Sequence, residues 1–114
     1  MTIDTKQVTL WTEKRDDQDY QILMINLKTD SITTDALKDL KEHDLLSILN
    51  TTKGVIINGK APIWLMAYLI HECHSTSWIA TNDPRLGAII IESHNPNHKV
   101  GDIVKWQSDQ RTAS

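Results

Sequence analysis

The segment HECHSTSWIATNDPRLG, residues 71–87, places two histidines, a cysteine, an aspartate and an arginine within seventeen positions. An imidazole can transfer a proton, a carboxylate can orient that imidazole or bind a metal, and a guanidinium can hold a phosphodiester. Together His74, Asp83 and Arg85 carry the groups that phosphodiester cleavage requires. The same residues also have structural interpretations, because histidine is favoured at helix C-termini and Asp-Pro-x-x-Gly suits a turn.

The spacing of His71 and His74 puts them on neighbouring parts of one face near the end of a predicted helix. Asp83 ends the strand that follows this helix, so we expect the sheet to bring its carboxylate close to His74. His-x-x-His alone is a weak metal signal, because the glutamate and third ligand of zinc motifs are missing. We interpret Cys73 as a small buried apolar residue.

A second polar site follows the β-branched run GVIIN, residues 54–58. Asn58, Gly59 and Lys60 stand where a buried strand leads into a helix that Pro62 favours in its first turn. Glycine lets a ligand approach the backbone, and free N–H groups at the helix start attract anions. This turn is either an anion-binding site or a plain strand-to-helix connection.

Further histidines lie downstream, where Glu92, His94 and His98 bracket the end of the next strand. We expect His94 at the same end of the sheet as Asn58, and His98 in a solvated loop. The tryptophans are dispersed, so we interpret them as core or interface residues and not as base-stacking platforms; they are Trp11, Trp64, Trp78 and Trp106.

The order of elements predicts an α/β protein in which helices pack on one mixed sheet. A hairpin around EKRDDQD is followed by a helix, which Ser31, Thr33 or Thr34 can cap, and by a short helical turn near His43 and Asp44. A strand, an apolar helix that we expect to be buried and three more strands complete the domain. Their ranges are 54–58, 63–70, 77–82, 87–93 and 103–106, and we expect the tail, 107–114, to be frayed.

Length and composition restrict the possible functions. A chain of 114 residues fits one domain, and its apolar runs are too short for a membrane span. We expect a cytoplasmic protein. One cysteine allows neither an internal disulfide nor a thiolate zinc cluster, and a net charge of −3 argues against binding duplex nucleic acid.

The motifs GVIINGKAPIWLMAYLIHECH, WIATNDPRLGAIIIESH and GDIV, between residues 54 and 104, resemble the third family of CRISPR ring nucleases. These are small CARF-like proteins that accompany type III systems. The combination of PIWL with DPRLG at this spacing is specific, whereas the N-terminal half shares only its order of elements with the family.

The resemblance implies a single Rossmann-related, CARF-like domain over residues 1–114 that binds cyclic tetra-adenylate and opens it with manganese. It implies a homodimer, which associates into a dimer of dimers or a filament around the ligand, so that catalytic groups are supplied in trans. Such a ring has only four phosphates and rotational symmetry, which suits a mildly acidic two-fold dimer. The resemblance assigns cleavage to His74, Asp83 and Arg85, and ligand binding to Asn58, Gly59, Lys60, His71 and His94.

Three positions depart from the family pattern. Asn58 stands where relatives often have serine, Lys60 where they often have arginine, and Asn82 where an aromatic residue often precedes DPRLG. Asparagine keeps hydrogen-bonding capacity, but lysine lacks the bidentate grip of arginine. We expect these changes to tune ligand affinity without removing the cleaving groups.

Three other functions remain as alternatives. The first is a module that binds cyclic oligoadenylate without cutting it. It gains support if His74 and Asp83 lie more than about 10 Å from any bound phosphate, or from each other across an oligomer contact. The second is a manganese-dependent ribonuclease that removes 3′ adenosines from linear RNA. The third is a small-metabolite enzyme in which two histidines and Asp83 form a metal site.

Overall fold

The computed structural model describes residues 1–107, which form one seven-stranded sheet. The strands lie in the sheet in the order in which they occur along the chain. The three central strands are parallel and the others are antiparallel, so the expected α/β class with one mixed sheet is confirmed. The strands are β1 (Thr2–Asp4), β2 (Val8–Glu13), β3 (Tyr20–Leu27), β4 (Gly54–Asn58), β5 (Trp78–Asp83), β6 (Gly87–Ser93) and β7 (Ile103–Val104).

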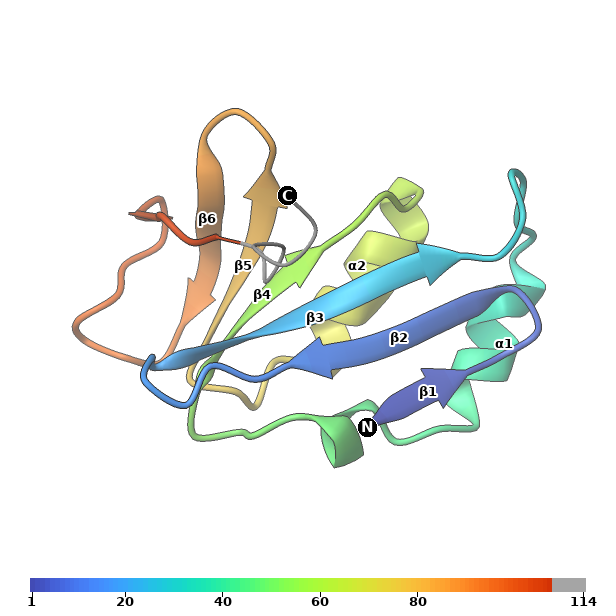
Figure 1. The fold of residues 1–114 in the computed structure, drawn as a ribbon, viewed down its shortest axis with the longest axis horizontal. Coiled ribbons are helices and arrows are strands. Elements are labelled where there is room, and N and C mark those ends of the chain that lie inside the picture. The colour runs from blue at the N-terminus through green and yellow to red at the C-terminus, as the bar shows by residue number, and fades with distance from the viewer. Residues whose placement is uncertain (108–114) are drawn as a thin grey trace.

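Two crossover connections carry the helices. The chain from β3 to β4 contains α1 (Asp35–Lys41) and the 3-10 helix η1 (Leu45–Ile48), and the chain from β4 to β5 contains α2 (Ile63–Glu72). Crossovers between parallel strands are right-handed, and both of these advance across the sheet in the same direction. The helices therefore lie on one face of the sheet, behind it in Figure 1, and leave the other face without a helix.

Each face of the sheet has its own hydrophobic core. On the helical face, Leu40 of α1 and Leu65 and Leu69 of α2 pack against alternate residues of the strands. On the helix-free face, buried Trp78 is the largest side chain, and Trp106 of the C-terminal segment packs against its cluster. Alternation along β3, β4 and β5 divides their side chains between the two cores.

The predicted hairpin, the strand at 54–58 and the DPRL turn are confirmed, and so is a short helical turn, for which Asp44 accepts a bond from the Leu46 amide at 3.1 Å. The first strand, β1, was missed because it has only three residues. Thr34, one of the three predicted cap residues, occupies the N-cap of α1, but its side chain forms no capping hydrogen bond.

The prediction of a helix buried on nearly every side was also wrong. Only Leu65 and Leu69 of α2 are fully buried, whereas Ile63 is 89% exposed. The reason is that the sheet covers only one face of α2, and the apolar run does not indicate which part of the helix meets it. Within residues 1–107, no helix is long and apolar enough to cross a membrane. Residues 108–114, most of the tail expected to be frayed, lie outside the described part.

Candidate functional site

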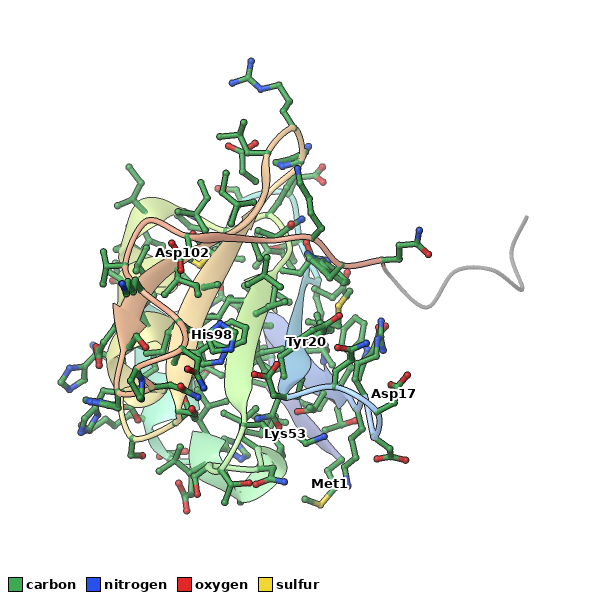
Figure 2. All side chains as sticks on the ribbon, turned by 90° about the vertical axis from the view of Figure 1, so that its left-hand side faces the viewer. Met1, Asp17, Tyr20, Lys53, His98 and Asp102 are labelled. Atoms are coloured by element: carbon green, nitrogen blue, oxygen red, sulfur yellow. The ribbon has the colours of Figure 1, made fainter. Side chains whose placement is uncertain are left out.

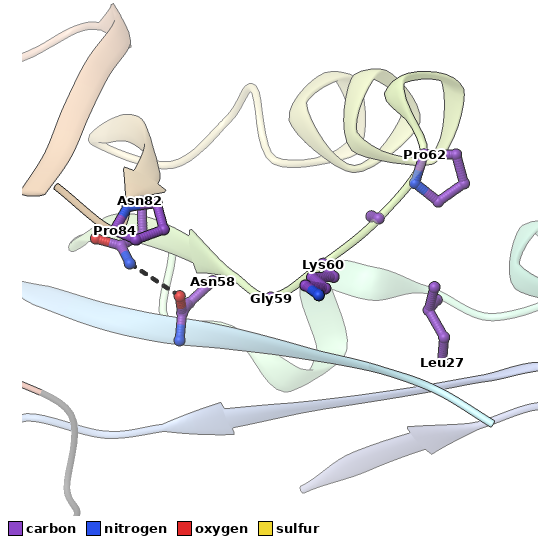
Figure 3. Close-up of a pocket in the computed structure, with 8 residues that line it drawn as sticks. Leu27, Asn58, Gly59, Lys60, Pro62, Asn82 and Pro84 are labelled. Atoms are coloured by element: carbon purple, nitrogen blue, oxygen red, sulfur yellow. Dashed lines mark hydrogen bonds between the residues drawn. The ribbon is translucent and has the colours of Figure 1, made fainter. Parts of the chain in front are cut away.

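The carboxyl ends of β4 and β5 meet the start of α2 around a cavity of about 620 Å³ (Figure 3). Parallel strands end at the same edge of a sheet, which is why residues from two crossover connections converge here. The predicted site at Asn58, Gly59 and Lys60 is therefore part of a real cavity. The complete lining is Leu27, Asn58, Gly59, Lys60, Ala61, Pro62, Asn82 and Pro84.

Gly59 has a structural reason to be glycine. Its φ is +138°, and a Cβ placed on it would lie 2.7 Å from the Ile25 carbonyl oxygen and 2.9 Å from the Ile25 Cβ. The sequence interpretation was that glycine lets a ligand approach the backbone. In the structure the backbone of β3, and not a ligand, approaches Gly59. This contact positions Asn58 and Lys60, the two neighbours of Gly59 in the chain.

The start of α2 makes this edge of the cavity electropositive. Pro62 occupies the N-cap with a φ of −61°, and no side chain caps the helix. The amides of Leu65 and Met66 donate to the Pro62 carbonyl, each at 3.0 Å, whereas the amides of the first two helical residues have no partner within the helix. Lys60, two residues before Pro62, is exposed, and its charge and these N–H groups are the kind of donors that an anion accepts.

The turn between β5 and β6 is stabilised by Asp83. Its Oδ1 accepts the amide of Arg85 at 2.8 Å and that of Leu86 at 3.1 Å. The bond from Arg85, then that from Leu86, holds the pKa of Asp83 below its usual value, so the carboxylate is ionised at neutral pH. The turn interpretation is confirmed. Arg85 is exposed, and no carboxylate of residues 1–107 pairs with its guanidinium.

The histidines gather at the other end of α2. The helix ends at Glu72, so His74 lies in the turn after it, and the prediction that His74 shares the helix with His71 was wrong. The rings of His71 and His74 stack with centroids 5.9 Å apart, and His74 Nδ1 lies 3.0 Å from the His71 carbonyl. His94 Nε2 lies 3.0 Å from the His74 carbonyl.

These bonds determine which nitrogen carries the proton. A carbonyl oxygen only accepts, so His74 bonds through Nδ1–H and His94 through Nε2–H. His74 is left with Nε2 as the nitrogen that is free to exchange a proton with another molecule, and it is exposed. The interpretation of a histidine at a helix C-terminus is confirmed for His71, which lies in the last turn of α2. The bond to the His71 carbonyl fixes the orientation of the His74 ring.

The structure does not bring His74 and Asp83 together in one chain, and this corrects the sequence expectation. His74 precedes β5 and Asp83 ends it, so the six-residue strand separates them by about 17 Å at about 3.3 Å per residue. His94 is also at the opposite end from Asn58, because β6 runs antiparallel to β5 and Ser93 pairs with Trp78. We call the two groups the pocket end, comprising residues 58–60 and 82–85, and the histidine end, comprising His71, His74 and His94.

Residues 1–107 of one chain hold no cluster of ligands that fits a manganese site. Within residues 1–107 no three histidine, cysteine, aspartate or glutamate side chains cluster closely enough to hold a metal ion. Glu92 lies 3.7 Å from His94, but a third donor is missing from that pair. A metal site built from two histidines and Asp83 of one chain is excluded by the position of Asp83.

Cys73 is fully buried, as predicted. Burial, followed by the charge of Glu72, raises the pKa of its thiol to about 12. Cys73 is therefore a packing residue beside the histidine end and not a nucleophile.

The sequence interpretation missed the contacts of two residues, His98 and Trp106. His98 is not a solvated loop residue, because its ring centroid lies 4.9 Å from that of Trp78 and its Nε2 lies 2.7 Å from Asp19 Oδ2. Figure 2 looks onto this part of the molecule, with His98 labelled. Trp106 donates its indole N–H to Asn82 at 2.9 Å, although we expected a core or interface role alone. All three contacts join residues far apart in sequence, and local patterns give no signal for them.

Comparison with known proteins relates the chain to a protein family and to a protein of another organism. The family model described as CRISPR-associated protein (Cas_csx3) matches residues 26–105. A protein of Aquifex aeolicus (strain VF5), described as an uncharacterized protein, is 37% identical over 102 residues, which are 89% of this chain and 91% of that one. The matched family range includes both the pocket end and the histidine end.

Proposed function

The chain belongs to the Cas_csx3 family of CRISPR-associated proteins, and on this basis we propose that it is a ring nuclease that binds and opens cyclic tetra-adenylate. Membership in the family supports a role in CRISPR systems. The specific substrate rests on the resemblance of residues 54–104 to ring nucleases and on the chemistry of the two ends.

The pocket end is the proposed ring-binding site. Lys60 and the uncapped start of α2 offer positive charge to a phosphate, and the exposed Arg85 offers a bidentate guanidinium. Asp83 holds the turn on which Arg85 sits. Two large apolar side chains close in sequence to cavity residues are also exposed. Ile63, which follows Pro62, is 89% exposed, and Leu86, two residues beyond Pro84, is 48% exposed, which supports association of this end with another molecule.

The separation of the two ends is the observation that carries the mechanism. A phosphate held near Asp83 and Arg85 is out of reach of His74 in the same chain, so His74 has to come from a second molecule. The site is then complete only in an assembly of chains. This supports the expected arrangement in which the ring lies between two dimers that complete each other in trans.

Each side chain has a defined part in this proposal. His74 exchanges a proton through Nε2, because Nδ1 is bonded to the His71 carbonyl. Arg85 stabilises the negative charge that grows on the phosphoryl oxygens during cleavage. Asp83 stays ionised and positions Arg85 through the turn, since a carboxylate with a lowered pKa is a poor proton donor at neutral pH.

A second candidate is a module that binds the ring without cutting it. It is favoured by the same separation of His74 from Asp83, because an isolated chain holds no complete set of cleaving groups. The two functions differ in whether activity appears when chains associate.

Complementation between inactive variants tests the proposal. Cyclic tetra-adenylate and manganese are incubated with His74→Ala, with Asp83→Ala, and with an equimolar mixture of the two. If one site takes His74 and Asp83 from different chains, each variant alone is inactive and the mixture regains part of the activity. The rate per chain should also rise with protein concentration. The matched control is His43→Ala, an exposed histidine beyond α1 that lies at neither end.

The outcomes separate the functions. Linear di- or tetra-adenylates from the mixture support cleavage in trans. Cleavage by the wild type without recovery in the mixture shows that each site is built within one chain, which refutes the mechanism. An intact ring that binds tightly favours the binding module, and no binding refutes both functions.

A further inference from the structure

Three side chains from three segments form a hydrogen-bonded chain at the pocket end. Trp106 Nε1 lies 2.9 Å from Asn82 Oδ1, and Asn82 Nδ2 lies 3.0 Å from Asn58 Oδ1. Asn58 ends β4, Asn82 is in β5, and Trp106 follows β7. Both asparagines line the cavity, whereas Trp106 packs into the core of the helix-free face.

The direction of this chain is set by the indole. An indole N–H only donates, so the amide oxygen of Asn82 must face Trp106 and its amino group must face Asn58. Asn58 must in turn present its oxygen to Asn82, and its own amino group is directed away from that bond (Figure 3). The orientation of an asparagine amide is usually ambiguous, but that of Asn58 is fixed by the indole N–H of Trp106, acting through Asn82.

The free amino group of Asn58 has almost no partner within residues 1–107. Its contact there is Met24 Sδ at 3.7 Å, and a thioether is a weak acceptor. Asn58 is partly buried and lines the cavity, and the weak bond to the thioether leaves most of the bonding capacity of its amino group for an acceptor that a ligand supplies.

We propose that Trp106 is a positioning residue that locks the Asn58 amide as a hydrogen-bond donor toward the ligand. The inference rests on the proposed function of the pocket end as a ring-binding site. It specifies the chemistry that Asn58 selects, namely acceptor atoms such as phosphate oxygens, ribose oxygens or unprotonated ring nitrogens of adenine. A ligand that places a donor at this point is disfavoured, because it meets another donor.

The test measures binding of cyclic tetra-adenylate by calorimetry, with His74→Ala as the background so that the ring stays intact. Trp106→Phe removes the indole N–H, keeps an aromatic ring and changes no charge. We expect roughly tenfold weaker binding than with the matched control Trp11→Phe, which removes an indole from β2. Thermal unfolding of each variant verifies that it is folded.

A second variant inverts the network. Asn82→Asp replaces the amino group that faces Asn58 with an acceptor, so the Asn58 amide must turn its amino group toward the new carboxylate and its oxygen toward the ligand. Binding should again fall roughly tenfold relative to Asn26→Asp, which adds the same charge on β3, beside the cavity that Lys60 also lines. The side-chain amide resonances of Asn58 should shift in Asn82→Asp and stay in place in Asn26→Asp.

The outcomes distinguish this inference from the proposed function. If the parent binds the ring and Trp106→Phe and Asn82→Asp each bind like their controls, the positioning role is wrong and ring binding stands. Weaker binding by both variants, with the Asn58 resonances shifted in Asn82→Asp, supports the role. If the parent does not bind the ring, the proposed function fails and this inference fails with it.

Discussion

Replacement of Gly59 by alanine tests how the pocket end is built. The substitution forces an L-residue to adopt a φ of +138° and places a Cβ 2.7 Å from the Ile25 carbonyl oxygen. Gly101→Ala is a matched control, because Gly101 also has a positive φ, +94°, but no atom lies within 4 Å of the added Cβ. Comparison of the two variants separates backbone strain from the steric contact with β3.

The expected magnitudes follow from those two terms. An alanine at positive φ costs about 1–2 kcal/mol, and we expect Gly101→Ala to lose that much stability. At Gly59 the contact with Ile25 adds about 1–3 kcal/mol, as for overpacking in a core, for a total of about 2–5 kcal/mol. For a domain of this size, a loss of 1 kcal/mol lowers the Tm by about 4 °C. The Tm should therefore fall by about 4–8 °C in Gly101→Ala and by about 8–20 °C in Gly59→Ala.

Urea unfolding and calorimetric melting measure these losses, and the dependence of the unfolding free energy on urea concentration should be the same in both variants. Ring binding is a second readout, because a shift of residue 59 also displaces Asn58 and Lys60, whereas Gly101 is remote from the cavity lining. Equal stability losses in the two variants would refute the claim that the approach of β3 requires glycine at this position.

Three further predictions concern other residues. Lys60→Ala should weaken ring capture several-fold more than it lowers the rate at saturation, with Lys60→Arg retaining both, and equal losses in affinity and rate would assign Lys60 a different role. Because burial raises the pKa of the Cys73 thiol to about 12 in the folded protein, the thiol of the unfolded chain ionises first as pH rises. The free energy of unfolding in urea should therefore be constant below about pH 8.5 and fall above it, and it should fall less steeply in Cys73→Ala. A native thiol that reacts with a thiol reagent at pH 8 would contradict the burial of Cys73. His98→Ala should red-shift the fluorescence of Trp78 by exposing the indole, whereas the exposed His43→Ala should leave it unchanged; the same spectrum in both would show that His98 does not cover Trp78.

Local patterns were sufficient to predict most of the fold. The β-branched run at 54–58 and the Asp-Pro-x-x-Gly turn carry information about their own backbone, and both formed as predicted. The exposure of Ile63 could not be predicted from the sequence, because an apolar helix can be covered on any side and only the position of the sheet decides which side is buried.

The candidate site was predicted in its parts but not in its assembly. The strand-to-helix junction before α2 is a local feature, so its position at residues 58–60 could be predicted, and these residues line the cavity; anion binding there stays a prediction. The expectation that Asp83 approaches His74 failed because strand direction was not taken into account: residues at opposite ends of one strand cannot meet. The partners of Trp106 and His98 depend on long-range packing, which neither spacing nor periodicity encodes.

The agreement between chain order and sheet order has a consequence for how the protein folds. Every strand pairs only with strands adjacent to it in sequence, and the longest loop to be closed is the β3–β4 crossover, residues 28–53. The entropic cost of closing such loops is modest, and no strand has to insert between two that are already paired. The sheet can therefore grow outward by one strand at a time, and refolding from denaturant should be rapid and free of topological traps.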